Sequence, residues 1–259
     1  MHERFYAPGV ADGCSVALPA EEGEHLARVM RLREGHTVAV FDGRGHEYLA
    51  VVESIGRRKV VVRATGPRAA APEPKVRLTV ALAVTKGGRM ESAVRDAAML
   101  GASVIQPVVT SRTEARVESA TRGSRRDRWQ RVAISSVKQC GRAVVPMVGE
   151  VLVLADYLAR ESSQMRLQLV EPQGDRRDAG PTTSSAGPMT SGSMPTLAAL
   201  STPDSAALLI GPEGGWAPEE IDAARRAGFH PITLGQRTLR ADATPIAAIA
   251  VLQFIWGDL

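Results

Sequence analysis

Short runs of β-prone residues, separated by turn signals, dominate the first quarter of the chain. Residues 37–41, 47–55 and 59–64 are such runs, and the Asp-Gly-Arg-Gly sequence at 42–45 is typical of a tight turn between the first two. Residues 22–31 predict a short helix before them. We therefore expect this part of the chain to form a small, β-rich unit.

The hydrophobic pattern changes after the first quarter. Residues 76–84 form a nearly continuous apolar run, which is typical of a strand buried on both faces of a sheet. A helix at about 90–100 and a second buried strand at 104–109 follow. Further on, the pattern predicts a helix over 126–140 and a strand over 166–170. Strand, helix and strand at this spacing indicate an α/β layer with a parallel sheet.

A Pro- and Ala-rich connector at 66–74 separates the two patterns. We therefore predict a β-rich domain over residues 1–70 and an α/β domain over residues 75–259. Within the second domain, residues 173–195 consist mainly of Gly, Ser, Thr, Pro and Asp, with almost nothing to bury. This composition predicts a disordered surface insertion, after which regular structure resumes at 196–200.

The most informative segment is an apolar run at 206–210 that leads directly into the sequence Gly-Pro-Glu-Gly-Gly at 211–215. A helix is expected to begin near Pro218 and to end at Gly228. Glycines let a backbone approach a ligand closely, and Glu213 supplies an acceptor for a ligand hydroxyl or amine. The loop lacks the glycine patterns of phosphate-binding loops, and its central acid disfavours an anion. The alternative is a tight strand-to-helix turn without a ligand.

A second glycine loop follows a second short strand at 229–234, with the sequence Gly-Gln-Arg-Thr-Leu-Arg at 235–240. The helix after it, 245–256, is apolar on nearly every side, which predicts that it is buried. Two glycine loops at the ends of adjacent strands form a pocket at the carboxyl edge of a sheet. Open α/β folds bind their ligands at this edge.

Charge is uneven along the chain. The 259 residues carry a formal net charge of +4, yet nine Lys or Arg and three acids lie between Arg112 and Arg142. Such a cluster can neutralise phosphates, the sequence-independent part of nucleic-acid binding. A solvated, Arg-rich helix face is the alternative interpretation. Overall composition, with 44% hydrophobic and 23% charged residues, is ordinary for a globular protein.

Several classes of protein are excluded by the residues that are scarce. Two cysteines, Cys14 and Cys140, make neither a disulfide framework nor a zinc-ligand pair, and the five histidines lack metal-ligand spacing. We therefore expect no metal. The charged first residues do not resemble a signal peptide, and no apolar run reaches the roughly 18 residues of a membrane span. We expect a cytoplasmic protein without a membrane segment.

The two glycine loops and the Ala-rich helix after them resemble the trefoil-knot signature of the SPOUT methyltransferases. Within that superfamily the chain is similar to the 16S ribosomal RNA (uracil-N3)-methyltransferases (the RsmE family), and the resemblance covers nearly the whole chain. Further matching segments are His-Leu-x-Arg-Val-x-Arg at 25–31, Phe-Asp-Gly-Arg-Gly at 41–45, Lys-Gly-x-Arg-Met-Glu at 86–91, Arg-Trp at 128–129 and Gln-Cys-Gly-Arg at 139–142.

The resemblance implies a fold, a cofactor and an assembly. The fold would be a small N-terminal β-barrel of the PUA-like type and a trefoil-knotted parallel-sheet domain, in which the last helix passes through a loop. Three knot loops would hold S-adenosyl-L-methionine, and the family acts as homodimers on small-subunit ribosomal RNA. The residues implied for cofactor binding are Val170, Glu171, Pro172, Ile210, Gly211, Pro212, Glu213, Gly214, Gly215, Leu234, Gly235, Leu239, Arg240 and Thr244.

The chain departs from the family pattern at a few positions. Met99 and Lys138 each stand where the family usually has Glu, and Ala217 stands where a Ser N-cap is common. After Arg240 the family favours Thr-Glu-Thr-Ala, whereas Ala243 and Thr244 place the hydroxyl one position later. The cofactor loops are intact, so these departures concern the substrate side.

The chemistry implied by the resemblance is methyl transfer to N3 of a uracil, an in-line displacement in which positioning of the reactants supplies much of the rate. The N3 proton must leave, and a fixed cation would stabilise the developing uracil anion. We expect Arg240 in this role, and Glu213 as hydrogen-bond acceptor or general base. For Arg240 the alternative is a salt bridge that closes the knot.

The basic side chains of the matching segments are expected to contact RNA phosphate. For the three in the first helix the alternative is an exposed amphipathic face without a ligand. The predicted RNA-binding residues are His25, Arg28, Arg31, Lys86, Arg89, Lys138 and Arg142.

Other functions stay open. The main alternative is a SPOUT methyltransferase that acts on a different RNA, such as transfer RNA or the large subunit. From another class, the chain could be an RNA-binding module without turnover, which the intact glycine loops and Arg240 disfavour. Methylation of a small molecule is disfavoured by the attached basic barrel.

Overall fold

The computed structural model describes residues 2–57, 59–113, 125–172, 201–240 and 243–259. The predicted insertion at 173–195 and the predicted return of structure at 196–200 lie outside these residues, as does most of the cationic segment before residue 125. The described chain forms two compact units. Unit 1 comprises Met1–Glu73 and Asp127–Met147, and unit 2 comprises Pro74–Arg126 and Val148–Leu259. Residues 127–147 thus cluster with the N-terminal segment, although they lie within the predicted range of the second domain.

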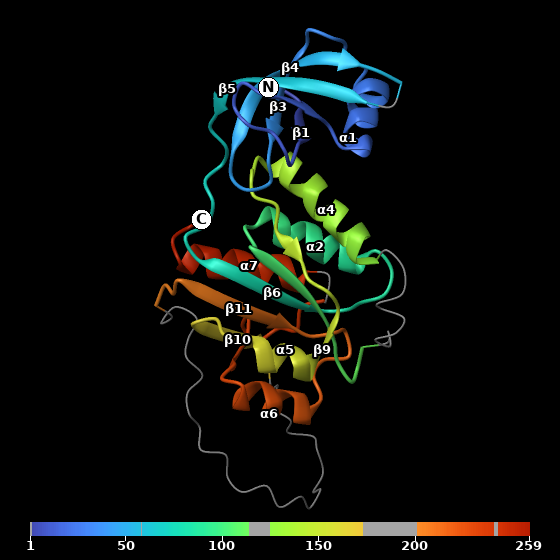
Figure 1. Ribbon diagram of the computed structural model, residues 1–259. Helices are drawn as coiled ribbons and strands as arrows, with labels where there is room; N and C mark the ends of the chain where they lie inside the picture. The colour runs from blue at the N-terminus through green and yellow to red at the C-terminus, as the bar shows by residue number, and fades with distance from the viewer. Residues whose placement is uncertain (1, 58, 114–124, 173–200, 241–242) are drawn as a thin grey trace, which may run out of the picture. The chain divides into compact units, whose positions relative to one another are not determined.

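Unit 1 contains a five-stranded sheet with the order β1-β3-β4-β5-β2 (Figure 1). The parallel pair is β1 with β3, and the other neighbours are antiparallel. Two register shifts in the β4–β5 pair mark bulges, which bend and twist a sheet. The strands are β1 (Arg4–Tyr6), β2 (Ser15–Ala17), β3 (Thr37–Phe41), β4 (Glu47–Ile55) and β5 (Val60–Arg68).

The predicted strands 37–41 and 47–55 are confirmed, while the third was too short. β5 runs to Arg68, because Tyr48 of β4 pairs with Pro67 and so extends the ladder into the predicted connector. β1 and β2 are three-residue strands without a local pattern, and they were not predicted. These short strands are stabilised by pairing with the longer strands β3 and β5, which lie far from them in the sequence.

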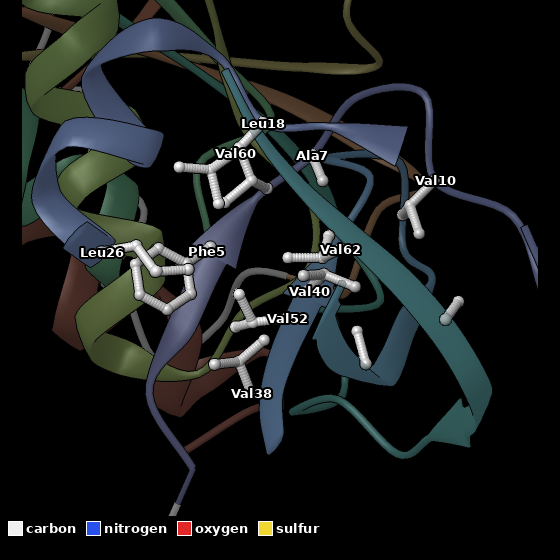
Figure 2. Close-up of a cluster of buried hydrophobic side chains, with 12 residues drawn as sticks. Phe5, Ala7, Val10, Leu18, Leu26, Val38, Val40, Val52, Val60 and Val62 are labelled. Carbon is white, nitrogen blue, oxygen red and sulfur yellow. The ribbon is translucent and has the colours of Figure 1, made fainter. Parts of the chain in front are cut away.

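The core of unit 1 is aliphatic, built mainly from valines of the sheet (Figure 2). Phe5 and Leu26 are fully buried and lie against Val38, Val40 and Val52. Leu26 belongs to the helical segment α1 (Ala20–Glu24) and η1 (His25–Val29), the second being one π-helical turn. The short helix predicted at 22–31 is therefore present, and its buried side covers one side of the sheet.

The end of that helix has an unusual backbone. Arg31 has φ +53°, the left-handed conformation that glycine usually supplies after a helix. The Leu32 N–H donates to the Leu26 carbonyl at 3.1 Å and closes the turn. An exposed arginine thus occupies a position that disfavours every residue with a Cβ.

Helix α4 (Arg125–Cys140) is fastened to the N-terminal sheet mainly through Arg4. The guanidinium donates to Glu47 and to the carbonyls of Val137, Lys138, Gly141 and Arg142, at 2.7–3.3 Å. Carbonyls at a helix end have no partner within the helix, and a cation compensates the negative end of its dipole.

Two more ion pairs hold the same helix and the segment after it to the N-terminal part of unit 1. Lys138 Nζ lies 2.8 Å from Glu22, and Arg142 Nη2 lies 2.5 Å from Glu73. Both cations are largely removed from solvent, with exposed side-chain fractions of 18% and 5%. Trp129 is buried, as expected for core packing.

Unit 2 is built on a seven-stranded sheet with the order β12-β10-β11-β6-β7-β8, and β9 pairs with β7 (Figure 1). The registered pairs among β12, β10, β11, β6, β7 and β9 are all parallel. The predicted parallel sheet is therefore confirmed. The strands are β6 (Arg77–Ala83), β7 (Val104–Val109), β8 (Met147–Val148), β9 (Leu152–Val153), β10 (Met165–Leu169), β11 (Ser205–Ile210) and β12 (His230–Ile232).

Helices cover both faces of this sheet, which explains its continuous apolar strands. On one face α5 (Leu154–Arg160) and α6 (Pro218–Arg226) pack over Ala81, Ala207 and Leu209. On the other face, α2 (Arg89–Met99) packs against α7 (Thr244–Ile255) (Figure 1).

Complete burial was predicted for α7, and this expectation is wrong for the single chain. Ala248, Ile249 and Leu252 are buried, whereas Ile246 is 45% exposed and Phe254 is 71% exposed. Neighbouring elements of the same chain cover one side of the helix and leave a second apolar side in solvent.

None of the described helices combines the length and the hydrophobicity that a membrane-spanning helix requires.

Candidate functional site

Three loops that follow adjacent strands form the walls of one cavity in unit 2. They leave the carboxyl ends of β12, β10 and β11, which are neighbours in the sheet. The cavity measures about 420 Å³, within the usual size range of ligand sites. Its lining residues are Arg89, Leu169, Val170, Glu171, Pro172, Ile210, Gly211, Pro212, Glu213, Gly215, Trp216, Leu234, Arg237, Thr238, Leu239, Arg240 and Thr244.

The structure brings together most of the residues that the sequence marked for cofactor binding. Of the fourteen, Gly214 and Gly235 do not line the cavity, and the other twelve do. Gly214 and Gly235 belong to the same loops as residues that do line it. The parallel topology explains this convergence, because it places the carboxyl ends of neighbouring strands at one edge.

The first glycine loop requires glycine for a steric reason. A Cβ on Gly211 would lie 2.8 Å from the Trp216 ring, closer than real Cβ contacts. Gly215 has φ +67°, and its N–H donates to the Pro212 carbonyl at 2.9 Å, which closes a turn. The loop therefore folds back on itself where it forms part of the cavity wall.

Trp216 connects two of the three loops. Its indole Nε1 donates to the carbonyl of Leu169 at 2.8 Å, and the side chain is buried. Leu169 is the last residue of β10, so this bond joins the loop after β11 to the start of the loop after β10. Trp216 was not among the predicted site residues, although an aromatic residue directly after a glycine loop is a usable signal.

The second glycine loop is anchored where it enters α7. The Arg240 carbonyl accepts from the N–H groups of Ala243 and Thr244, at 3.0 Å each, and from the Thr244 hydroxyl at 2.8 Å. Thr244 Oγ1 thus fixes the turn before the helix, in place of an N-cap side chain at Ala243. Residues 235–240 are all exposed.

Charged side chains of both signs surround the cavity. Arg89 Nη1 lies 2.5 Å from Glu213 Oε1, and the two side chains are 50% and 44% exposed. Arg237 and Arg240 line the opposite loop. Arg237 was not predicted, and its position, three residues before Arg240 in the same loop, was the available signal. The site thus combines a paired carboxylate with cations at its rim.

The predicted RNA-binding residues are divided between the two units. Arg89 lines the cavity, and Lys86 is exposed in the loop before α2. In unit 1, Arg28 and Arg31 are exposed, and Arg28 pairs with Glu24 at 2.7 Å. His25 is half-buried, with its ring 6.2 Å from that of Phe5. The buried ion pairs of Lys138 and Arg142 described above disfavour phosphate contact by these two side chains.

Within the described residues, no group of three or more His, Cys, Asp or Glu side chains could hold a metal ion.

Family models match both parts of the chain. One for an RNA methyltransferase domain matches residues 72–253, and one for an RNA methyltransferase PUA domain matches residues 18–65. With the parallel sheet and the cavity at its carboxyl edge, these matches define a two-domain RNA methyltransferase.

Full-length relatives make the assignment narrower. Ribosomal RNA small subunit methyltransferase E of Mycobacterium bovis is 31% identical over 97% of this chain and 92% of its own length. The protein of that name from Synechocystis is 29% identical over 94% of this chain and 74% of its own. The chain belongs to the family of ribosomal RNA small subunit methyltransferase E.

Solved structures agree with this assignment. A crystal structure of ribosomal RNA small subunit methyltransferase E from Neisseria gonorrhoeae, bound to S-adenosyl methionine, superimposes with a TM-score of 0.82. It is 28% identical and covers 99% of this chain and 98% of its own. A putative methyltransferase from Legionella pneumophila, in complex with the same cofactor, gives a TM-score of 0.83 at 28% identity, with 98% of each chain covered. The predicted fold class is thereby confirmed.

Proposed function

We propose that this protein transfers a methyl group from S-adenosyl-L-methionine to N3 of a uridine in small-subunit ribosomal RNA. The observation that carries the proposal is the cavity formed by three loops at the carboxyl ends of β12, β10 and β11. It lies in a chain whose relatives modify small-subunit RNA and include a structure with that cofactor bound. A cytoplasmic location follows from such a substrate.

The residues present fit S-adenosylmethionine. Glu171 and Glu213 line the cavity together with Arg89, Arg237 and Arg240, and charges of both signs suit a ligand that carries a sulfonium, an ammonium and a carboxylate group. Leu169, Ile210 and Leu239 offer apolar surface. Glycines at 211 and 215 let backbone groups approach a ligand closely. When bound, the sulfonium supplies an electrophilic methyl group.

Arg240 is the residue that we propose to act on the acceptor base. Its guanidinium stabilises the negative charge that develops on the uracil ring as the N3 proton leaves. Glu213 accepts a hydrogen bond from the ligands or receives that proton. Arg89 holds the Glu213 carboxylate through Oε1, so its orientation is set before a ligand arrives.

We assign RNA phosphate contact to the exposed basic residues of the predicted set. These are Arg28 and Arg31 in unit 1 and Lys86 and Arg89 near the cavity, with His25 beside the first pair. For Lys138 and Arg142 we propose that their buried ion pairs stabilise unit 1 instead. Lys138 replaces a glutamate of the family pattern, and Glu22 provides its counter-charge here.

We further propose that the protein is a homodimer with a knotted C-terminal domain. The exposed apolar side of α7, which includes Ile246, Val251 and Phe254, supports an interface between two copies. Sedimentation velocity should show a dimer for the wild type and a monomer for Phe254→Asp. The sheet order, in which β11 lies between β10 and β6 and β12 lies on the far side of β10, supports the passage of α7 through a loop.

Two measurements test the function. Calorimetry with S-adenosylmethionine should show binding to the purified protein, and the absence of binding would leave only the RNA-binding alternative. Mass spectrometry of ribosomal RNA from a deletion strain should show one uridine of the small subunit without its methyl group. The wild-type gene should restore it and Arg240→Ala should not. A missing methyl in another RNA would support the alternative substrate.

A further inference from the structure

The first glycine loop is held in place by Trp216 and by residues that do not line the cavity. Glycine has little conformational preference of its own, so contacts outside the loop must fix the position of 211–215. Trp216 supplies one such contact through Leu169. The others come from Glu220 in the first turn of α6 and from the turn after β7. No pattern in the sequence indicated that these two segments contact each other.

Glu220 binds two backbone N–H groups that are far apart in the chain. Its Oε1 accepts from Ser111 N at 2.7 Å, and its Oε2 accepts from Ala217 N at 3.0 Å. The second contact is half of a capping box, whose other half is absent because Ala217 has no side-chain oxygen. The first contact goes beyond helix capping, since it joins the helix after the glycine loop to the loop after β7.

The segment that Glu220 engages is itself a closed turn. The Thr113 N–H donates to the Thr110 carbonyl at 3.2 Å, and Thr110 N donates to the Thr113 hydroxyl at 3.0 Å. Thr110 is only 6% exposed. This turn, residues 110–113, therefore offers a fixed surface to the glycine loop.

Arg112 makes a second connection from the same turn. Its Nη1 donates to the Gly214 carbonyl at 2.9 Å. A Cβ on Gly214 would lie 3.5 Å from the Arg112 Cβ, so the two backbones run close together. Gly214 is one of the two predicted cofactor residues that do not line the cavity. Its carbonyl accepts the hydrogen bond from Arg112 instead.

We propose that Glu220 and Arg112 are positioning residues for the methyl donor. Together they fasten the turn 110–113 behind the first glycine loop and fix the backbone that faces the cavity. Hydrogen bonds of this kind act on a ligand through the residues that touch it. At metal sites, their loss typically lowers ligand affinity about 10–100-fold. We expect an effect of about 10-fold here. The proposal rests on the proposed function, since it requires that the cavity binds S-adenosylmethionine.

The decisive experiment compares two neighbouring glutamates. Glu220→Ala removes both hydrogen bonds, Glu220→Gln retains one acceptor oxygen, and Glu219→Ala removes an exposed carboxylate of the same helical turn. Calorimetry with S-adenosylmethionine on the full chain without RNA should give a Kd about 10-fold higher for Glu220→Ala and about 3-fold higher for Glu220→Gln. Glu219→Ala should remain within about 2-fold of the wild type.

Steady-state kinetics separate positioning from loss of folded protein. For Glu220→Ala we expect a higher KM for S-adenosylmethionine, an unchanged KM for RNA, and a kcat that recovers at saturating cofactor. Arg112→Ala should likewise raise the KM for S-adenosylmethionine, by about 3-fold, with an unchanged KM for RNA and a kcat that recovers at saturating cofactor. Because both residues hold one turn, the double variant should raise this KM by less than the product of the two single effects.

Two outcomes would overturn the proposal. In the first, Glu220→Ala binds the cofactor as tightly as the wild type, with or without a lower Tm, and the carboxylate then only caps α6. In the second, kcat at saturating cofactor falls with an unchanged KM. A wild type that fails to bind S-adenosylmethionine would instead refute the proposed function, so the two failures are distinguishable.

Discussion

Two groups of basic side chains, one in each unit, have opposite environments. In unit 1, Arg4, Lys138 and Arg142 are largely buried, and each lies against a carboxylate. In unit 2, Arg237 and Arg240 are exposed at the rim of the cavity. Basic residues thus stabilise the fold in the first group and face a ligand site in the second.

This difference shows how to assign roles to a basic protein's cations. A buried, paired cation cannot reach a phosphate without leaving a carboxylate unpaired in the interior, which costs several kcal/mol. An exposed cation keeps its charge available, and its removal scarcely affects stability. Stability and function should therefore respond to different arginines, and four predictions follow from the largest expected effect to the smallest.

Arg4→Ala should destabilise the protein most. It removes one of the two arginine partners of Glu47, whose side chain is 2% exposed, and four hydrogen bonds to carbonyls at the end of α4 and just after it. Because Arg68 still pairs with Glu47, we expect a loss of about 3 kcal/mol, the low end of the range for breaking a buried pair. Urea unfolding should show this loss, whereas Arg28→Ala, which removes an exposed pair, should stay within about 1 kcal/mol of the wild type. Equal losses would contradict the distinction.

Arg240→Ala should give the opposite result. We expect kcat to fall about 100–1000-fold, the usual effect of removing one group that stabilises charge in the transition state. The free energy of unfolding should change by less than about 0.5 kcal/mol, because the side chain is exposed. Arg226→Ala, on the exposed surface of α6, serves as the control with unchanged kcat. A loss of stability in Arg240→Ala would favour the salt bridge that closes the knot.

The turn at 42–46 is an intermediate case, in which a buried acid holds exposed basic residues. Burial raises the pKa of Asp42, but hydrogen bonds from the Arg44 and His46 N–H groups and from the His46 ring outweigh it, and the net pKa is lowered from 3.8. Because the pKa is lowered in the folded state, the ionised carboxylate stabilises the protein at pH values above the ordinary pKa. This stabilisation is lost as the pH falls through the lowered pKa of the folded state.

Asp42→Asn should therefore cost about 1–3 kcal/mol at neutral pH, as expected for hydrogen bonds to a charged group. The difference from the wild type should shrink below about pH 4, where the wild-type carboxyl takes up its proton. Chemical unfolding at pH 7 and at pH 3 measures both values. A difference that is the same at both pH values would mean that the charge of Asp42 contributes nothing.

Arg31→Gly should change stability and RNA binding in opposite directions. Glycine relieves the left-handed backbone strain and should stabilise the fold by about 1 kcal/mol. Loss of a phosphate contact should weaken RNA binding and reduce the slope of log Kd against log salt by about one. Arg31→Lys retains the charge and should retain the slope. If glycine leaves RNA affinity unchanged, Arg31 only compensates the helix dipole.

Much of the architecture could be read from local patterns. The strands at 37–41, 47–55 and 104–109 have their predicted limits, since alternation and apolar runs report burial directly. The two glycine loops were found because their glycines directly follow apolar strands, whereas the loop at 170–172 was implied by the family resemblance alone. The missed strands β1 and β2 have three residues each, too few for a period to show.

Other features of the site were beyond local reasoning. Trp216, Arg112 and Glu220 act through hydrogen bonds to residues 47, 102 and 109 positions away in the chain. Such partners are set by how strands are ordered in the sheet, and no spacing in the sequence encodes that order.

The sequence by itself determined the two folding patterns, the glycine loops at the ends of buried strands, and the family that these define. Only the tertiary structure decided which arginines are interior and which face the cavity, that residues 127–147 pack with the N-terminal unit, and that α7 keeps an exposed apolar side. The physical reason is that periodicity records whether a position is buried, whereas the partner that buries it comes from a distant part of the chain.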